Sequence, residues 1–322
     1  MPRPRKPFAR AVLGLGVILS FATQAAAPTR NHDAWTVDAV RTLVVRGDAR
    51  SLATAAMLVQ TANRPEGIDG LHGIDLAERA ALASPGDRAI GWIRFRVCEL
   101  TPGCDVPGAA TTLRWTDADN AAPWLSTLAA AMKDKDDQAQ DRALAGLSEG
   151  KRFYLYWNPA AVLVFDAYKA VGITGPRGGA TSDHARLDLA AALSASIVVP
   201  AFRPLMDACR ETQGRQRRRE FCIKIAGLLQ RADAVSSQLE GYAIQRRLYA
   251  PDSKEARSAT DHQKNLESRK ATAGKFETAF LPWFNNRLAL HRLALMRQFP
   301  REEDVLNAVL REHHINGETP HD

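Results

Sequence analysis

The sequence predicts an all-α protein, built as an array of helical hairpins that is continued by a C-terminal bundle of longer helices. Alanine and leucine dominate its apolar residues. Stretches with β-branched or aromatic residues at alternate positions are scarce, which favours helix over sheet. Apolar residues instead recur at the three- and four-residue spacing of a helix face. The segment 85–93 also aligns with 117–125, an offset of about 32 residues that is close to the period of helical-hairpin repeats.

The N-terminus has the three parts of a secretory signal peptide. Four cations come first, at Arg3, Arg5, Lys6 and Arg10. An apolar run of about a dozen residues follows, and Ala25 to Ala27 supply the small residues that cleavage requires. An uncleaved membrane anchor is the alternative, but the run is shorter than the ~20 residues of a spanning helix. We expect residues 1–27 to be removed, no transmembrane segment to remain, and a periplasmic or secreted protein.

The charge balance argues against a nucleic-acid partner. The formal net charge is +7, but four of the cations lie in the first 27 residues, which contain no Asp or Glu. Removal of the signal peptide leaves a mature chain of about +3, too weakly basic to indicate nucleic-acid binding on its own.

The four cysteines fit export into an oxidising compartment. They form two sequence-local pairs, Cys98 with Cys104 and Cys209 with Cys222. Three disulfide connectivities are possible, and the two local pairs need the least rearrangement of the chain. A metal site is the competing interpretation, but the spacings are not those of zinc knuckles and no histidine lies near either pair.

The N-terminal half reads as a series of short helices separated by turns. Asn31 or Asp33 is the expected cap of the first helix, and Asp48 of the second, after a break at Gly47. Two amphipathic helices joined by a polar turn are expected within 117–147. The other helices expected here span 34–45, 49–62, 74–83, 88–98 and 106–113.

Two tryptophans follow small or turn-forming residues in the segment 74–147. The residues of this pattern are Ala77, Ala80, Pro85 and Trp92, then Asp119, Asn120, Ala121, Trp124, Leu128 and Ala131. The segment thereby resembles tetratricopeptide and Sel1-like helical-repeat proteins, in which a large aromatic residue packs against alanines of neighbouring helices. The resemblance implies a hairpin array that binds other molecules, and it implies no particular substrate.

The densest aromatic cluster follows this array. Together with the two tryptophans above, it supplies the candidate binding residues, which are Trp92, Trp124, Phe153, Tyr154, Tyr156 and Trp157. Aromatic side chains are enriched in binding grooves. The alternative is a helix end packed on the next hairpin, and core packing explains all six residues equally well.

The C-terminal half is expected to hold longer helices. Asn158 should cap a helix that continues to about residue 173, and the glycine-rich stretch 174–180 is the best domain boundary. We therefore divide the mature chain into a repeat region, 28–173, a helical region, 181–315, and a disordered tail, 316–322. The two helical parts are either separate domains or one continuous domain. In the second region, Thr181 or Ser182 should cap a first helix, which Pro200 and Pro204 should break. A polar helix or loop is expected at 253–275, and Ser268 or Thr272 should cap the helix that follows it. The other expected helices span 220–231, 234–249, 276–299, which Pro282 interrupts, and 301–313.

Three local patterns resemble functional motifs without their context. Gly146 to Gly150 match G-x-S-x-G, but a helix rather than a strand precedes the serine. Gly175 to Gly179 lack the spacing of phosphate-binding loops. His313 and His314 are adjacent, so their side chains diverge on a helix. We therefore assign no catalytic residue, no metal site and no cofactor.

The basic cluster at Arg215, Arg217, Arg218 and Arg219 is interpreted as a solvated face, with a polyanion site as the alternative.

The function that we expect is that of an exported binding or scaffold protein whose concave surface holds a protein, peptide or envelope component. The alternative is an envelope hydrolase or lyase with an all-helical active site. Its candidate residues are close in sequence, and they are Asp166, Tyr168, Asp183 and His184. Whether the chain is an enzyme stays open, although the lack of a motif favours binding.

Overall fold

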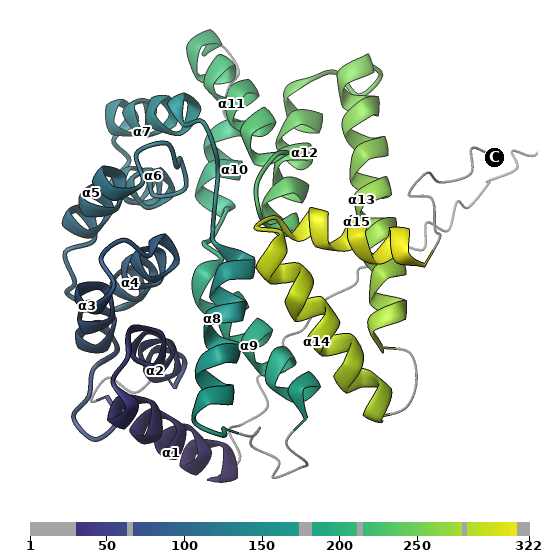
Figure 1. Ribbon diagram of the computed structural model, residues 1–322. Helices are drawn as coiled ribbons and strands as arrows, with labels where there is room; N and C mark the ends of the chain where they lie inside the picture. Colours follow the sequence, from purple (N-terminus) through teal and green to yellow (C-terminus); the bar gives the residue numbers. More distant parts are fainter. Residues whose placement is uncertain (1–29, 63–66, 174–181, 211–214, 279–281, 314–322) are drawn as a thin grey trace, which may run out of the picture.

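The computed structural model describes residues 30–62, 67–173, 182–210, 215–278 and 282–313, and within them it contains fifteen helices and no strand. The predicted all-α array of helical hairpins is confirmed (Figure 1). The helices are α1 (Arg30–Arg46), α2 (Ala49–Thr61), α3 (Gly73–Ala83), α4 (Arg88–Leu100), α5 (Val106–Thr116), α6 (Trp124–Lys133), α7 (Asp137–Glu149), α8 (Trp157–Ala170), α9 (Asp183–Val198), α10 (Arg203–Arg210), α11 (Gln216–Leu229), α12 (Val235–Leu248), α13 (Lys254–Thr278), α14 (Pro282–Gln298) and α15 (Glu302–Glu312).

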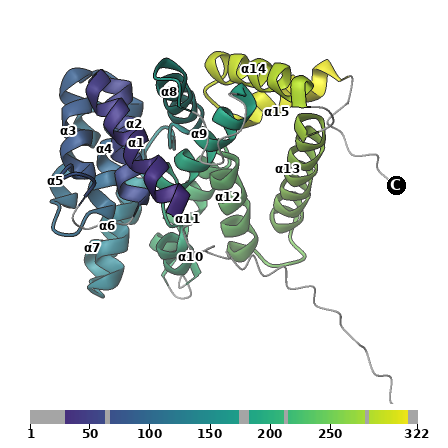
Figure 2. The ribbon, with the colours of Figure 1, turned by 90° about the horizontal axis from the view of Figure 1, so that it is seen from below.

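In the N-terminal array, α3 and α5 form an outer row and α2, α4 and α6 form an inner row, and α1 packs on α2 at the end of the array; α13 lies on the opposite side of the molecule (Figures 1 and 2). The inner row packs on the C-terminal half along its length. α2 and α4 contact α8 and α9, α6 contacts α10, and α7 contacts α11. The inner side of the array, which we expected to be open for a partner, is therefore occupied by helices of the chain itself.

Two side chains of α4 hold the C-terminal end of α9. The indole Nε1 of Trp92 donates to the carbonyl of Val198 at 3.0 Å. The guanidinium of Arg96 donates to the carbonyls of Ile197, at 2.9 Å, and Val199, at 3.1 Å. These bonds satisfy carbonyls that a helix end leaves without an intrahelical partner, and the cation complements the negative end of the helix dipole. Both side chains are buried, so they fasten the two halves together.

Short polar side chains start many of the helices. Asp48 and Ser182 accept backbone N–H bonds from the first turns of α2 and α9, which confirms both predicted caps. Two other expected caps are wrong. α1 begins at Arg30, so Asn31 and Asp33 lie inside its first turn. α8 begins after Tyr156, so Asn158 is already helical.

Two further expectations in the C-terminal half have clear outcomes. The polar stretch is the continuous helix α13, so neither Ser268 nor Thr272 caps a new helix. Four apolar side chains on one face of this polar helix are buried, and they are spaced by three or seven residues: Ala256, Ala259, Leu266 and Ala273. The expected break near Pro200 and Pro204 is confirmed, because α9 and α10 are separated there and bent by 47°.

Both local disulfides are formed, Cys98–Cys104 and Cys209–Cys222, with Cα–Cα distances of 5.4 and 5.6 Å. No single described helix is long and apolar enough to span a membrane, although the bent pair α9–α10 passes that test when its two parts are joined. The predicted signal peptide, the boundary at 174–180 and the tail at 316–322 lie outside the described residues.

Removing a disulfide should destabilise the fold, and the loss should be larger for the disulfide that closes the longer loop. Replacing Cys209 and Cys222 with serine opens a separation of 13 residues, and we expect the free energy of unfolding to fall by about 3 kcal/mol. The same change at Cys98 and Cys104 opens only 6 residues and should cost about 2 kcal/mol. Urea unfolding of both double variants checks this order, and a larger loss from the shorter loop would contradict it.

Candidate functional site

An extended segment, residues 150–156, crosses between α7 and α8 through the interior. Phe153 and Leu155 are fully buried, so the backbone polar groups around them need partners other than water. The predicted alternative of a helix end is wrong for this segment. Its first part lies beside the turn before α6, where the N–H groups of Lys151 and Arg152 donate to the carbonyl of Asp119 and the N–H of Ala121 donates to the carbonyl of Arg152.

Asn120 continues this pairing with its side chain. Its amide accepts from the N–H of Tyr154 at 3.0 Å and donates to the carbonyl of Tyr154 at 2.9 Å. The same amide nitrogen donates to Asp117 at 2.9 Å. A single asparagine thus replaces a strand neighbour for one residue of the extended segment.

Asp117 is a buried carboxylate at the end of α5. It accepts the hydroxyl of Tyr156 at 2.5 Å and a guanidinium N–H of Arg152, and Arg88 at the start of α4 lies 4.0 Å away. Burial and the hydrogen bond to Asp117 raise the pKa of the Tyr156 hydroxyl, which therefore stays a donor. Asp117 ties the start of α4 to the residues that lead into α8.

Asp233, in the turn before α12, holds the end of the extended segment. Its carboxyl oxygens accept the N–H of Leu155 at 2.8 Å and of Trp157 at 3.2 Å. Complete burial raises the pKa of this carboxyl to about 7, although the backbone donors partly offset the effect. Its carbonyl accepts the N–H of Glu302 at 2.7 Å, so the same residue fixes the start of α15.

Asn158 completes this framework. Its side-chain amide donates to the carbonyl of Phe299 at 2.9 Å and so attaches the α14–α15 turn to the first turn of α8. The starts of α4, α8 and α15 are thereby held by a few buried polar side chains, and the first two of these starts border a cavity.

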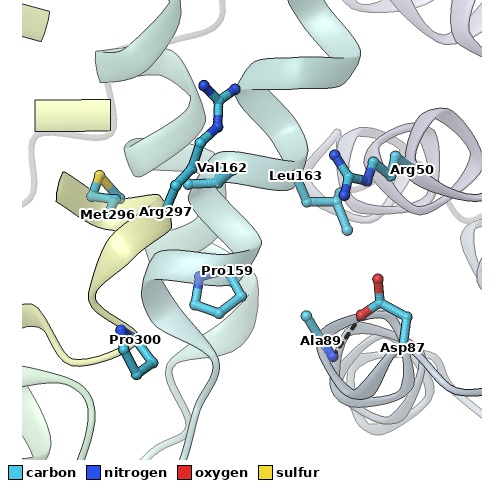
Figure 3. A pocket seen from close by; sticks show the side chains of 9 residues that line it. All are labelled: Arg50, Asp87, Ala89, Pro159, Val162, Leu163, Met296, Arg297 and Pro300. Carbon is cyan, nitrogen blue, oxygen red and sulfur yellow. Dashed lines mark hydrogen bonds between the residues drawn. The ribbon is translucent and has the colours of Figure 1, made fainter. Parts of the chain in front are cut away.

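This cavity, which we call the joint cavity, has a volume of about 270 Å³ and lies where the N-terminal array meets the C-terminal helices (Figure 3). It is lined by Arg50 of α2, Asp87 and Ala89 at the start of α4, Pro159, Val162 and Leu163 of α8, Met296 and Arg297 of α14, and Pro300. Its α8 and α14 walls are mostly apolar, whereas its charged groups lie at the rim.

Asp166 of α8 orients the two arginines of the rim. It accepts Nη1 of Arg50 at 2.9 Å through one carboxylate oxygen and Nη2 of Arg297 through the other. Asp87 faces the cavity from α4, and its Oδ1 caps the helix by accepting the N–H groups of Ala89 and Ile90 at 2.9 and 3.2 Å (Figure 3). The cavity therefore offers an apolar floor and oriented charges of both signs.

The predicted aromatic contacts are mostly structural in this conformation. Trp92 and Phe153 are fully buried and cannot touch a ligand. Tyr156 is buried with its hydroxyl on Asp117. Tyr154 and Trp157 are partly exposed, and neither lines the joint cavity.

Trp124 is partly exposed at the start of α6, and the chain packs around it. The guanidinium of Arg114 lies 4.5 Å from the indole centroid. Gly146 of α7 also lies against the indole, because an added Cβ there would approach the ring to 2.4 Å. This close approach explains the first glycine of the G-x-S-x-G match, and the Ser148 hydroxyl merely donates to the carbonyl of Ala145 within the helix.

The candidate catalytic residues do not share a cavity. Asp166 is engaged with two arginines. Tyr168 is buried, and its hydroxyl has no hydrogen-bond partner among the described groups. Asp183 pairs with Lys169 and Arg186. His184 lies 3.4 Å from Asp188 on the same helix. Tyr168, Asp183 and His184 do not line the joint cavity.

The basic cluster joins helices rather than forming a free cationic face. Arg215 pairs with Asp137 of α7 at 3.1 Å, and the buried Arg218 pairs with Asp141 at 2.6 Å. Arg219 donates to the carbonyl of Leu248 and lies over the ring of Tyr249. These contacts dock α11 on α7 and α12.

In the described part of the chain, no group of three His, Cys, Asp or Glu side chains is placed to hold a metal.

Sequence reasoning did not identify Arg50, Asp87 and Arg297 as parts of one site. They belong to three helices, and Arg50 and Arg297 are 247 positions apart in the chain. Each is an ordinary charged residue in its own helix, so only the packing of α2, α4 and α14 around α8 brings them together.

Breaking the Asp117 network should be costly. Replacing Asp117 with alanine leaves Arg152, Tyr156 and Asn120 without their shared acceptor, and we expect a loss of about 3–5 kcal/mol in the free energy of unfolding. Asp119→Ala in the same turn is the matched control, because among the described ion pairs its carboxylate contacts only Lys151, at the surface, and the variant should unfold almost like the wild type. Equal losses in the two variants, measured by urea unfolding, would show that the network contributes little.

Asp233 should make stability depend on pH. Its folded-state pKa of about 7 lies above the ordinary value of 3.8, so its contribution is complete below about pH 4 and is lost as the pH rises through 7. The unfolding free energy of the wild type minus that of Asp233→Asn should therefore decrease between these pH values and then level off. Urea unfolding at a series of pH values measures this difference. A difference that stays constant, or that grows with pH, is the opposite of what we expect.

The two aligned sequence segments have different positions in their helices. Trp92 is the fifth residue of α4, whereas Trp124 is the first residue of α6.

No family model, no curated protein and no solved structure matches this chain. The resemblance of residues 74–147 to tetratricopeptide and Sel1-like repeats therefore stays a prediction.

Proposed function

We propose that this chain is an exported binding or scaffold protein whose ligand occupies the joint cavity. The observation that carries the proposal is the combination of an apolar floor with oriented charges at the junction of the two helical regions. Ligand sites in proteins commonly pair an apolar wall with a few placed polar groups and lie between structural units. The inner side of the array is filled by α8, α9 and α10, so this cavity takes the place of the open concave surface that the sequence suggested.

The lining favours binding over catalysis. Its ionisable members are Arg50, Asp87 and Arg297, and Asp87 already serves as a helix cap. The described lining includes no serine, cysteine, histidine or tyrosine that would act as a nucleophile or as a general acid and base. Guanidinium groups and a capping carboxylate instead suit recognition of a charged, hydrogen-bonding ligand.

The partner that we propose is a protein, a peptide or an envelope component, met after export to the periplasm or the exterior. The two formed disulfides support an oxidising compartment. A hairpin array related to tetratricopeptide or Sel1-like repeats would be a suitable scaffold for such a partner, with the joint cavity as its specific contact.

The test is capture of partners from an envelope extract of the source organism by the immobilised, oxidised mature protein. Val162→Trp is the blocking variant, because Val162 is partly exposed and lines the cavity, so a larger side chain there fills the cavity while α8 stays intact. Val45→Trp is the matched control, since Val45 lies exposed on α1. We expect the wild type and Val45→Trp to capture the same component and Val162→Trp to lose at least about nine-tenths of it.

Mass spectrometry identifies the captured component, and circular dichroism verifies that the variants are folded. Capture that is equal for all three proteins would move the binding site away from the joint cavity. Capture by none of them would remove the support for a binding function.

A further inference from the structure

The arginine pair of the joint cavity, together with Asp166, carries one net positive charge, whereas the carboxylate of Asp87 lies on the facing wall. Arg50 and Arg297 contribute two positive charges, and Asp166 between them contributes one negative charge. Among the described contacts, each guanidinium uses one Nη on Asp166, which leaves further N–H donors on both arginines. A ligand with one carboxylate would neutralise the Arg50–Asp166–Arg297 group and accept charge-assisted hydrogen bonds from guanidinium groups that are already oriented.

The floor next to these arginines accommodates an apolar side chain. It consists of Val162 and Leu163 on α8, Met296 on α14, and two proline rings at its edge. The volume of about 270 Å³ lies just below the range of drug-sized ligand sites, so it suits a fragment about as large as one amino-acid residue.

Asp87 supplies an acceptor on the facing wall. Its Oδ1 receives both capping N–H bonds, whereas no hydrogen bond from a described group reaches Oδ2 (Figure 3). An N–H group of the ligand is therefore the complement of Asp87. The positive end of the α4 dipole and the neighbouring Arg88 favour a neutral amide N–H there over a charged ammonium group.

From these three features we infer that the joint cavity binds the C-terminal residue of a peptide. The terminal carboxylate lies on Arg50 and Arg297, an apolar last side chain lies on Val162, Leu163 and Met296, and the last amide N–H donates to Asp87. This inference rests on the proposed function and adds to it the class of ligand. Capture of a terminal carboxylate is an established way for proteins to recognise peptides, and a free amino acid is disfavoured because its ammonium group would face the α4 terminus.

The test uses isothermal titration calorimetry on the mature, oxidised protein. The first probe is N-acetyl-Gly-Gly-Leu, and the matched control is the same peptide with its C-terminus blocked as an amide. We expect the free acid to bind at least about tenfold more tightly, because the amide lacks the charge-assisted bonds to both arginines. Free leucine is the third probe and should bind more weakly than the acetylated peptide.

Protein variants localise the effect. Arg297→Gln and Arg50→Gln should each weaken binding of the free acid by about tenfold or more, and both should reduce the preference for acid over amide. Arg203→Gln is the control, since the side chain of Arg203 is 90% exposed on α10 and, among the described ion pairs, contacts only Asp207.

Three outcomes overturn the inference: equal binding of acid and amide, equal losses from Arg297→Gln and Arg203→Gln, or binding of free leucine as tight as that of the peptide. If no peptide binds but capture from the extract still depends on Val162, the cavity keeps its binding function and only the ligand class is wrong. If no peptide binds and that capture also fails, both proposals fall.

Discussion

The structure depends on how a non-helical segment passes through a helical core. Helices satisfy their own backbone, whereas residues 150–156 cannot, and the fully buried Phe153 and Leu155 keep water away from part of this segment. An unpaired buried amide costs about 1–3 kcal/mol, so several in succession would offset much of the stability of a domain. The chain provides partners from two directions, Asn120 with the carbonyl of Asp119 on one side and Asp233 on the other.

This solution also determines how the two helical regions fit together. Asp117 belongs to the N-terminal array and Asp233 to the C-terminal helices, and both bind the short stretch that leads into α8. Trp92 and Arg96 add a second attachment at the end of α9. Several buried polar groups thus lie where helices of distant sequence meet, and their directional hydrogen bonds restrict how these helices can pack.

Much of the fold could be predicted from the sequence because the signals are local. The Asp48 and Ser182 caps, the break near Pro200 and Pro204 and the short-range disulfides each involve residues a few positions apart. The start of α8 was misjudged, because Asn158 followed by proline is a favourable cap by its own propensity. Tertiary contacts override that propensity. Asp233 accepts the N–H of Trp157, and the side-chain amide of Asn158 donates to the carbonyl of Phe299. Tyr156 takes the cap position with a φ of 55°.

The site was harder to predict than the fold for the same physical reason. The aromatic residues that the sequence brought forward are large and apolar, and such residues are most often enclosed, as Trp92 and Phe153 are. The joint cavity instead depends on charged residues that no local pattern distinguishes. Arg50, Arg297 and Asp87 acquire a common role only after α8 has been fixed between the inner row and α14.

The Arg50–Asp166–Arg297 group adds little to stability, and the ligand recognition that we propose would give it a role. Both arginine side chains are about half exposed, and ion pairs at such positions contribute little to folding because water screens them. Their value lies in orientation. Immobilising a long side chain on binding costs about 0.5–1.5 kcal/mol, and Asp166 has already restricted both guanidinium groups before a ligand arrives. The framework of Asp117, Asn158 and Asp233 likewise fixes the cavity walls in advance. A preorganised binding site requires polar groups that are held in place before the ligand arrives. Here the rim adds little to the stability of the fold, and a buried network that should be costly to break holds it in position.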